Sequence, residues 1–556
     1  MINHMRKIHT NDVLSCALLL LSVYASAQTS GPDLQGAIRP VQPSISKQLN
    51  LPGVTSGDGL PAPGGVQVTL KEVVISGNHH IDTSTLLVNL GHLEDRQFDM
   101  RGLMEIINAI GDQYRKAGYL FSQAYLPPQD LSTGQLKVQV IEGQYGLVQT
   151  TGEPSLAEPS QPFLEYGLHS GDPIENAQLE RTMLIIDDLP GIKVKPLMKP
   201  SQIEGGSDLL VNVYDDESEE SGNFGFDNTG SRSTGEHRLV GSIHLNNKII
   251  FGDKFSLTAV VTDKRMWLGS LDYDVPVGYS GLRGDFSYAH TSYVLGGDFS
   301  SLGAHGIADT TSFQMYHPVV RSQLTNLYMS LSLHHKELQD VYANVDLTHN
   351  KRSNGLVAGL RFDHQDRFVG GGITYGSASL TQGELSLDSA MYLSDLSAAQ
   401  TAGGFGKSNV DIARIQLLTE DFSLYGRFSG QWANKNLDAS EKFNLGGYYG
   451  VRAYPMGEGT GDRGYLGQFE LRYAVSQELT PFVFYDAGYS KLNARPWSVA
   501  NSNATRAISG QGVGVRSVYD QWHIDMTLAA QGHGGAATSD SENRNPRFFF
   551  MVSRSF

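Results

Sequence analysis

Cysteine is almost missing from this sequence: of its 556 residues, Cys16 alone carries a thiol. It lies in an N-terminal segment that we expect to be removed, so the mature chain would contain no disulfide. A chain of this length can build a hydrophobic core without one. The lack of cysteine also excludes thiolate zinc sites and thiol catalysis.

Long hydrophobic runs are missing as well. Apart from residues 13–23, no apolar stretch approaches the roughly 20 residues of a membrane-spanning helix. That short run follows Arg6 and Lys7 and is followed by Ala25-Ser26-Ala27. A basic start, a short apolar centre and an A-x-A site predict a secretory signal peptide over residues 1–27.

Charged side chains are scarce: they make up 18% of the sequence, against about 25% in typical soluble domains. The net charge of -16 would repel phosphates, which argues against a nucleic-acid partner. Glycine (62), tyrosine (25) and phenylalanine (23) are abundant. This composition is typical of a membrane β-barrel, whose spanning strands need only about 9–11 residues.

Catalytic and metal-binding motifs do not stand out. The sequence contains no H-E-x-x-H, no G-x-S-x-G and no Walker loop. Two pairs of adjacent histidines, His79-His80 and His334-His335, would project to opposite faces of a strand and chelate poorly. Gly370-Gly371-Gly372 predicts a tight turn, since no helix follows it. We therefore expect no catalytic residue, no bound metal and no cofactor.

The N-terminal third predicts a linker and a first α+β module. Residues 28–65 are rich in proline, glycine and serine and predict a flexible linker or, alternatively, a short plug helix. The elements expected next are a strand (66–76), two helices (83–90, 101–117) and two strands (119–126, 135–141). The longer helix has apolar residues at helical spacing, namely Leu103, Ile106, Ile107 and Ile110. We assign residues 66–143 to this β-α-α-β-β module.

The same order repeats over residues 144–215. The expected elements are a strand (145–150), two helices (162–168, 176–189) and two strands (192–197, 208–214). Pro190-Gly191 ends the second helix. Two copies of one module in tandem indicate a structural repeat.

Helical periodicity stops after the acidic run at residues 215–220, which we interpret as a solvated hinge rather than a Ca²⁺ site. Segments of about ten alternating residues follow, and sixteen fit between Asn223 and Phe556. In one of them Phe422, Leu424, Phe428 and Trp432 face away from Ser423, Arg427, Ser429 and Gln431. We therefore predict a membrane β-barrel of about 16 antiparallel strands over residues 216–556. A soluble β-sandwich is the alternative, but sandwiches rarely contain so many strands.

The expected connections alternate in length. Those after even-numbered strands are short, whereas long ones (338–353, 381–408, 434–464, 533–546) follow odd-numbered strands. Short periplasmic turns and longer external loops are typical of outer-membrane barrels, so both modules should lie in the periplasm. The terminal Phe556 shares a face with Phe548, Phe550 and Val552, as a final lipid-facing strand requires. We expect Phe556 to serve barrel insertion.

Four strings in the modules resemble a known family. They are Tyr-Arg-x-x-Gly-Tyr (114–119) with AYLPPQ (124–129), VIEG (140–143) and LERTMLIIDDLPG (179–191). They resemble the two POTRA modules of two-partner secretion transporters, the TpsB or ShlB-FhaC-HecB family of hemolysin activation/secretion proteins. The resemblance implies two periplasmic POTRA modules followed by a 16-stranded outer-membrane barrel.

The barrel supplies two further similarities. The string beginning Val451-Arg452-Ala453-Tyr454 resembles the V-R-G-Y/F motif of a loop that the family folds into the barrel lumen. Phe484-Tyr485-Asp486 is similar to its F-x-D motif on the thirteenth strand. Ala453 departs from the usual glycine, and would be strained if the motif needs a positive φ there.

The physical chemistry of these residues agrees with the resemblance. A charge at Asp486 is costly in lipid, so its face should be the lumen, where Arg452 is the natural counter-charge. Breaking a buried ion pair costs roughly 3–5 kcal/mol although forming one gains little, so the pair suits a device that fixes the position of the loop. Glu470 and Arg472 on the twelfth strand face the same way and would join the network. Without the resemblance, a solvated loop arginine and a pore-lining acid would be the simpler interpretation.

The function implied is export of a partner exoprotein, of the adhesin or hemolysin type, that carries an N-terminal secretion domain. The POTRA modules would capture the unfolded client by adding it to a strand edge. We expect those edges at residues 119–126, with Tyr119 and Leu126, and at 192–197, with Ile192 and Leu197. The barrel should be a monomer in outer-membrane lipid, inserted by the barrel-assembly machinery. An outer-membrane assembly factor is the main alternative, and a passive porin or a secreted hydrolase are weaker ones.

Overall fold

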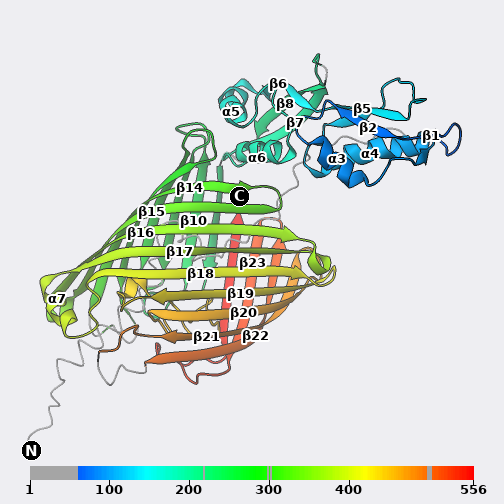
Figure 1. Cartoon of the computed structure of the whole chain (residues 1–556). Coiled ribbons are helices and arrows are strands. Elements are labelled where there is room, and N and C mark those ends of the chain that lie inside the picture. The colour runs from blue at the N-terminus through cyan, green and yellow to red at the C-terminus, as the bar shows by residue number, and fades with distance from the viewer. Residues whose placement is uncertain (1–59, 204, 217–219, 297–299, 301–302, 498–503) are drawn as a thin grey trace, which may run out of the picture.

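The structure, a computed structural model, describes residues 60–203, 205–216, 220–296, 300, 303–497 and 504–556. The expected signal peptide (1–27) and the linker up to residue 59 lie outside the described residues. Two small α+β modules stand at one end of a large barrel (Figure 1). In the described part of the chain, no helix has the length and apolar character needed to cross a membrane.

The first module is a three-stranded sheet with two helices. Its main elements are β2 (Glu72–Ser76), α3 (Thr83–Leu90), α4 (Met100–Lys116), β4 (Gln123–Tyr125) and β5 (Gln135–Ile141), with β1 (Val68–Thr69) and β3 (Gln97–Phe98) forming a small separate ladder. The strand order is β2-β5-β4; β5 runs parallel to β2 and antiparallel to β4. The carboxylate of Asp99 caps α4 by accepting from the Gly102 N–H at 2.9 Å. The apolar face of α4 covers the sheet and supplies much of the buried core.

The second module repeats the arrangement. It contains β6 (Gln144–Gly152), α5 (Pro154–Gly167), α6 (Asn176–Asp187), β7 (Ile192–Pro200) and β8 (Gly206–Asp215). Its strand order is β6-β8-β7, with β8 parallel to β6 and antiparallel to β7, as in the first module. The expected β-α-α-β-β repeat is therefore confirmed.

Three expected boundaries in the modules were wrong. The strand expected over 66–76 is broken at Leu70, because the backbone of Leu70 pairs with Arg96 and Asp95 instead of β5. The strand expected over 119–126 is only Gln123–Tyr125, because the preceding residues form a turn closed by Ser122 N–H on the Tyr119 carbonyl. The helix expected over 162–168 begins at Pro154, although it contains Pro159 and Pro162. Burial of its apolar face outweighs the hydrogen bonds that the two prolines cannot make.

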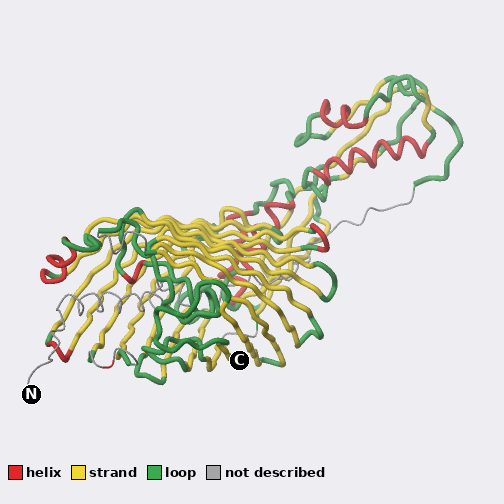
Figure 2. Tube along the Cα trace, turned by 90° about the horizontal axis from the view of Figure 1, so that it is seen from below, coloured by secondary structure: helices red, strands yellow, loops and turns green. Residues whose placement is uncertain are grey.

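The barrel is closed and has sixteen antiparallel strands, which confirms the predicted fold class. The strands are β9 (Glu220–Asp227), β10 (Arg238–Asn246), β11 (Lys254–Thr262), β12 (Trp267–Pro276), β13 (Arg283–Val294), β14 (Ala304–Arg321), β15 (Thr325–Tyr342), β16 (Leu347–Asp366), β17 (Gly372–Leu387), β18 (Gly403–Leu417), β19 (Phe422–Ala433), β20 (Arg463–Tyr473), β21 (Leu479–Lys491), β22 (Thr505–Tyr519), β23 (Trp522–Gln531) and β24 (Arg547–Ser555). β24 pairs with β9 to close the wall. Figure 2 shows these strands as one continuous wall, with the modules at one end.

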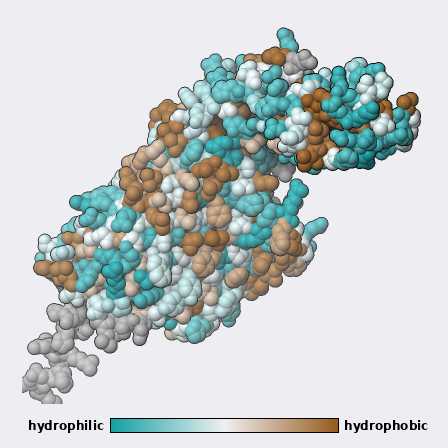
Figure 3. All heavy atoms as spheres, in the orientation of Figure 1, coloured by the Kyte–Doolittle hydropathy of each residue, from teal (hydrophilic) through white to brown (hydrophobic). Residues whose placement is uncertain are grey.

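Side chains alternate across this wall. On β19 the outward residues Phe422, Leu424, Phe428 and Trp432 are exposed, as an apolar face toward lipid requires. Hydrophobic side chains gather over the middle of the barrel wall in Figure 3, and hydrophilic ones are frequent toward the end that carries helix α7 (Ser389–Leu396).

Two external loops are shorter than expected. β15 continues to Tyr342 and β16 begins at Leu347, so most of the expected loop 338–353 is strand. β17 and β18 likewise extend into the expected loop 381–408, leaving only the connection that contains α7. The outward side chains of β15 change from apolar to polar after Leu333. The ladder continues because backbone hydrogen bonds and polar pairs such as Glu337–Arg352 (3.2 Å) still stabilise it. The other two long connections, 434–462 and 532–546, agree with the prediction.

The second module docks on the turns that follow even-numbered strands. The guanidinium of Arg321, at the end of β14, donates to both carboxylate oxygens of Asp188 at 2.6 and 2.7 Å. The Asn247 side chain donates to the Pro190 carbonyl at 2.7 Å. Phe163 packs edge-on against Tyr279, with ring centroids 5.1 Å apart. The modules therefore share the side of the short turns, the side expected to be periplasmic.

Glu142, in the VIEG string, connects three parts of the first module. Its carboxylate accepts from the backbone N–H groups of His79 and His80 at 2.8 Å and from the Tyr114 hydroxyl at 2.7 Å. The His80 ring nitrogen lies 2.7 Å away. Burial by itself would raise the pKa of Glu142, but these hydrogen bonds outweigh it and lower the pKa to about 2.

Glu142→Gln should destabilise the first module by about 1–3 kcal/mol at neutral pH, because a neutral amide cannot carry the charge that these donors stabilise. Since the folded pKa is depressed from 4.5 to about 2, this stabilisation is complete above pH 4.5 and is lost as pH falls toward 2. Amide hydrogen exchange of α4 and β5 in the full chain measures it. Asp112→Asn, on the exposed side of α4, is the matched control and should leave exchange unchanged. Equal protection in the wild type and Glu142→Gln at pH 7 would contradict the prediction.

Candidate functional site

The candidate site is the loop 434–462, which connects β19 and β20 and packs inside the barrel. The residues at its tip, Val451, Ala453 and Tyr454, are completely buried. They belong to an apolar cluster with inward residues of the wall, including Phe482, Phe484, Leu466, Ile508 and Ala529. The tip turns tightly at Gly450, where a Cβ would lie 2.3 Å from the Leu445 carbonyl oxygen. This loop, which the resemblance places in the lumen, fills part of the channel.

Arg452 makes the central polar contact of the tip. Its guanidinium donates to both oxygens of Asp486 at 2.8 Å, and its backbone N–H donates to the same carboxylate at 3.1 Å. A third guanidinium nitrogen donates to Glu470 at 2.6 Å. The guanidinium carbon also lies 3.6 Å from the centroid of the Phe484 ring. Arg452 and Asp486 are 4% and 0% exposed, so their charges depend on each other rather than on water.

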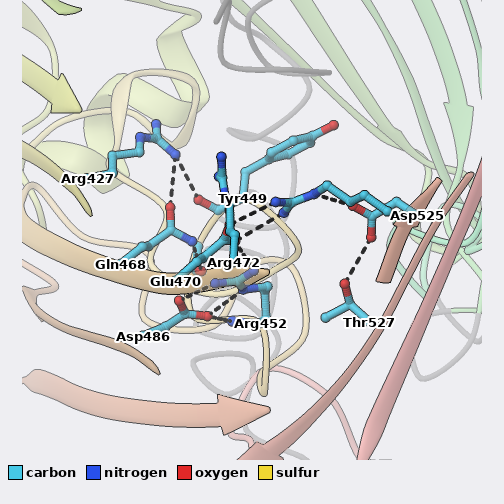
Figure 4. Close-up of polar contacts among 11 residues, drawn as sticks. Arg427, Tyr449, Arg452, Gln468, Glu470, Arg472, Asp486, Asp525 and Thr527 are labelled. Atoms are coloured by element: carbon cyan, nitrogen blue, oxygen red, sulfur yellow. Dashed lines mark hydrogen bonds and ion pairs between the residues drawn. The ribbon is translucent and has the colours of Figure 1, made fainter. Parts of the chain in front are cut away.

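Glu470, on β20, joins this pair to a larger network (Figure 4). Besides Arg452, it accepts from Arg472 at 2.9 Å and from Arg516 at 2.8 Å. Arg516 in turn donates to Asp525 at 2.9 Å. The guanidinium groups and carboxylates of the loop tip and of four neighbouring strands thus neutralise each other. The structure brings Arg452, Asp486, Glu470 and Arg472 together as the sequence predicts.

Arg516 and Asp525 were missed by reasoning from the sequence. They are direct partners across β22 and β23. The sequence signal that could have indicated them is an arginine and an aspartate at inward positions of two lipid-spanning strands. Two further side chains hold the loop backbone itself. Gln468 donates to the Gly450 carbonyl at 2.9 Å, and Arg427 donates to the Tyr449 carbonyl at 3.3 Å.

Ala453 is not strained by a positive φ. It is not among the described non-glycine residues with positive φ. Its methyl group faces Gly510 of β22, where a Cβ would lie only 2.4 Å from the Ala453 Cβ. The wall therefore has the space that this extra methyl group needs. The next residue, Tyr454, donates its hydroxyl to the carbonyls of His533 and Gly535 in the last external loop, at 3.0 and 2.9 Å.

The base of the loop is held by a second group of ion pairs, the loop-base clasp. Glu441 contacts Lys336 of β15 at 2.7 Å and Lys407 of β18 at 2.8 Å. Asp438 contacts Lys351 of β16 at 3.2 Å. In each case the loop supplies the carboxylate and the wall supplies the lysine. The sequence alone does not indicate these pairs, because the partners are 34–105 positions apart and no local pattern relates one to the other.

The expected client-binding residues lie in different settings. Tyr119 is not on a strand edge: its ring packs against His80 and its hydroxyl lies 3.4 Å from Glu175 of the second module. Leu126 follows β4 and is half-buried against the first core. Ile192 is buried, whereas Leu197 is exposed on the edge strand β7.

Phe556 lies directly after β24, beside β9. Its backbone exchanges two hydrogen bonds of 3.0 Å with Gly222, and its side chain is exposed. Among the described residues no group of three or more His, Cys, Asp or Glu is placed to hold a metal. His334 is buried and its neighbour His335 is partly exposed, as opposite faces of β15 require.

These features define a class: an outer-membrane barrel with periplasmic α+β modules, whose lumen is occupied by an inward-folded, ion-paired loop. Residues 205–517 match the family model of the haemolysin secretion/activation protein ShlB/FhaC/HecB, and residues 68–143 match the ShlB-type POTRA domain. Since the first match covers more than half of the sequence, the chain belongs to the haemolysin secretion/activation protein family. Proteins of this family are outer-membrane transporters of partner exoproteins, and their POTRA modules are periplasmic.

Individual relatives agree with this assignment. The heme/hemopexin transporter protein HuxB of Haemophilus influenzae (strain 86-028NP) is 27% identical over 456 residues, which cover 80% of each chain. The outer membrane transporter CdiB of Dickeya dadantii (strain 3937) is 25% identical over 426 residues, 74% of this chain and 73% of the relative.

Solved structures support the fold. CdiB from Escherichia coli aligns over 100% of both chains with a TM-score of 0.73 and 18% identity. BamA from Haemophilus ducreyi lacking POTRA domains 1–3 aligns over 88% of this chain and 100% of its own, with a TM-score of 0.51 and 12% identity. At these identities the likeness concerns the fold alone.

Proposed function

We propose that this transporter captures its unfolded partner exoprotein on the periplasmic POTRA modules and passes it through the barrel after the loop 434–462 rearranges. The observation that carries the proposal is the buried Arg452–Asp486 pair, which joins a loop to the wall of the channel. A channel whose lumen is occupied by its own loop must move that loop to admit a polypeptide. An ion pair suits this role, because its geometry positions the loop while its net contribution to stability is small.

In this function the chain needs no catalytic residue, cofactor or metal. Residues 1–27 are cleaved as a signal peptide. The barrel-assembly machinery inserts the barrel, with a role of Phe556, and the barrel then works as a monomer in outer-membrane lipid. The client is a secreted exoprotein with an N-terminal secretion domain. Because HuxB is described as a heme/hemopexin transporter, a heme- or hemopexin-binding exoprotein is one client class to test first.

Co-expression with a candidate exoprotein that carries an N-terminal secretion domain tests the proposal. The wild type should deliver the partner to the surface or the medium, and deletion of residues 66–214 should abolish delivery, because the capture modules are lost. Arg101→Ala, which removes an exposed pair with Glu105, is the control and should export normally. Heat-modifiable gel mobility shows whether each barrel is folded.

An outer-membrane assembly factor is the other outcome of this experiment. If export is indifferent to the deletion while the assembly of other outer-membrane barrels suffers, that function replaces the one proposed. A passive porin does not need two modules docked on its periplasmic turns by contacts such as Arg321–Asp188.

A further inference from the structure

Capture by strand addition needs a sheet edge with free backbone groups. The three-stranded sheets of the two modules have four edge strands: β2 and β4 in the first, β6 and β7 in the second. Three of these edges are already closed by hydrogen bonds, by prolines or by their short length. The fourth edge is open.

The edge of β7 is closed. Pro196 lies opposite Val211 of β8 but has no N–H to donate to it. The backbone groups of Pro196 therefore face away from β8, and so do those of every second residue along β7. On that outer side Ile192 donates to the Leu189 carbonyl at 3.1 Å and Val194 donates to Asp187 at 3.2 Å. Pro200 lacks an N–H as well. An incoming strand would meet hardly any free donor here.

The edge of β6 is closed by the module itself. Tyr145 exchanges hydrogen bonds with the segment 171–172, at 2.7 and 2.9 Å. Farther along, the side-chain amide of Gln161 on α5 accepts from the Thr150 N–H at 2.7 Å and donates to the Val148 carbonyl at 3.1 Å. Gln161 thus occupies the position that a neighbouring strand would take.

The edge of β4 is too short to pair. The strand has three residues, the turn before it uses the N–H of Ser122, and Pro127 and Pro128 follow it closely. Beyond β4, the side-chain amide of Gln129 exchanges two hydrogen bonds with the backbone of Lys137, at 2.7 and 2.8 Å. On β4 only Ala124 keeps backbone groups that face outward.

The edge of β2 is different. Lys137 of β5 faces the β4 side, and its register partner on β2 is Val74. In a parallel ladder Val74, together with Glu72 and Ser76, therefore directs its backbone groups toward β5. The backbone N–H and C=O groups of Val73 and Ile75 therefore point away from the sheet. Within the described residues no hydrogen bond is made to them from that side. The strand contains no proline, and its Val-Val-Ile sequence favours extended pairing.

We propose that an extended segment of the exported partner adds to the edge of β2 in the first module, while the second module serves as the connector to the barrel. This inference rests on the proposed function. The added strand would alternate in character, with apolar side chains beside Val73 and Ile75, which face the helices and the core, and polar ones on the solvent face.

Photo-crosslinking in the full-length transporter tests the proposal, with the purified N-terminal secretion domain of the co-expressed exoprotein as the probe. A benzophenone amino acid at Ser76, the last residue of β2, should crosslink the probe. The same group at Gln149 of β6 or Leu197 of β7 should not. Val73→Pro removes one free N–H and places a ring on the edge, and should lower both crosslinking and export roughly tenfold.

Two variants control for side-chain loss and for the proline ring. Val73→Thr keeps the N–H, so its crosslinking and export should exceed those of Val73→Pro. Met198→Pro places the same ring on the closed edge of β7 and should export normally. Full export by Val73→Pro, or crosslinks at Gln149 or Leu197 instead of Ser76, overturns the β2 assignment although the transporter function stands. If the wild type does not export the exoprotein at all, the proposed function itself fails.

Discussion

Arg452→Ala should reduce export of the partner by roughly tenfold or more while the barrel remains folded. The substitution leaves Asp486 buried without its counter-charge, a loss of about 3–5 kcal/mol for a pair of this burial. It also removes the hydrogen bond to Glu470 and the contact with the Phe484 ring. The loop tip then has apolar packing but no fixed orientation. Export yield and heat-modifiable mobility measure the two effects separately.

The double variant Arg452→Ala/Asp486→Ala distinguishes positioning from stability. It removes both charges, so most of the lost stability should return, but the loop should stay misplaced and export should stay low. Arg452→Lys should be intermediate, because an ammonium cannot donate to both carboxylate oxygens of Asp486 in the same fork. Recovery of export in the double variant would show that the pair matters for stability alone.

Glu441→Gln should open the closed channel. The change leaves Lys336 and Lys407, whose side chains are 4% and 15% exposed, without the carboxylate that neutralises them at the loop base. We expect the base of the loop to leave the wall, and conductance in planar lipid bilayers to rise several-fold in the absence of a client. Export should fall as well, because the loop no longer returns to one closed position.

A matched control is available on β15, the strand that carries Lys336. Glu337 is next to Lys336 on β15 but faces outward, and its contact with Arg352 is exposed. Glu337→Gln should leave conductance and export unchanged, because exposed pairs contribute little. If Glu441→Gln and Glu337→Gln behave alike, the loop-base clasp does not hold the channel closed.

Much of the fold could be predicted because its signals are local. A period of 3.6 residues marks α4, alternation marks β19, and short turns after even-numbered strands place the modules on the periplasmic side. Boundaries were less accurate where tertiary contacts outweigh local preference. Helix α5 includes two prolines because its apolar face is buried. β15 and β16 continue beyond their apolar outward side chains because each strand stabilises the other.

The candidate site divides in the same way. Arg452 and Asp486 were found through short motifs, and alternation gave the inward face of Asp486. Arg516, Asp525 and the loop-base clasp were not found. Their charges are visible in the sequence, but which carboxylate meets which cation depends on how sixteen strands are staggered around the barrel.

The sequence by itself determined the class of protein: an outer-membrane chain with two repeated modules and a lipid-facing barrel, because period and composition are properties of neighbouring residues. Only the tertiary structure decided how the loop is held and which sheet edge is open. Glu441 meets Lys336 across 105 positions, and β7 is closed by a carboxylate from α6, while β2 is left free. Ion pairing and edge capping depend on distances in space, and in a closed barrel these are set by the register of every strand between the partners.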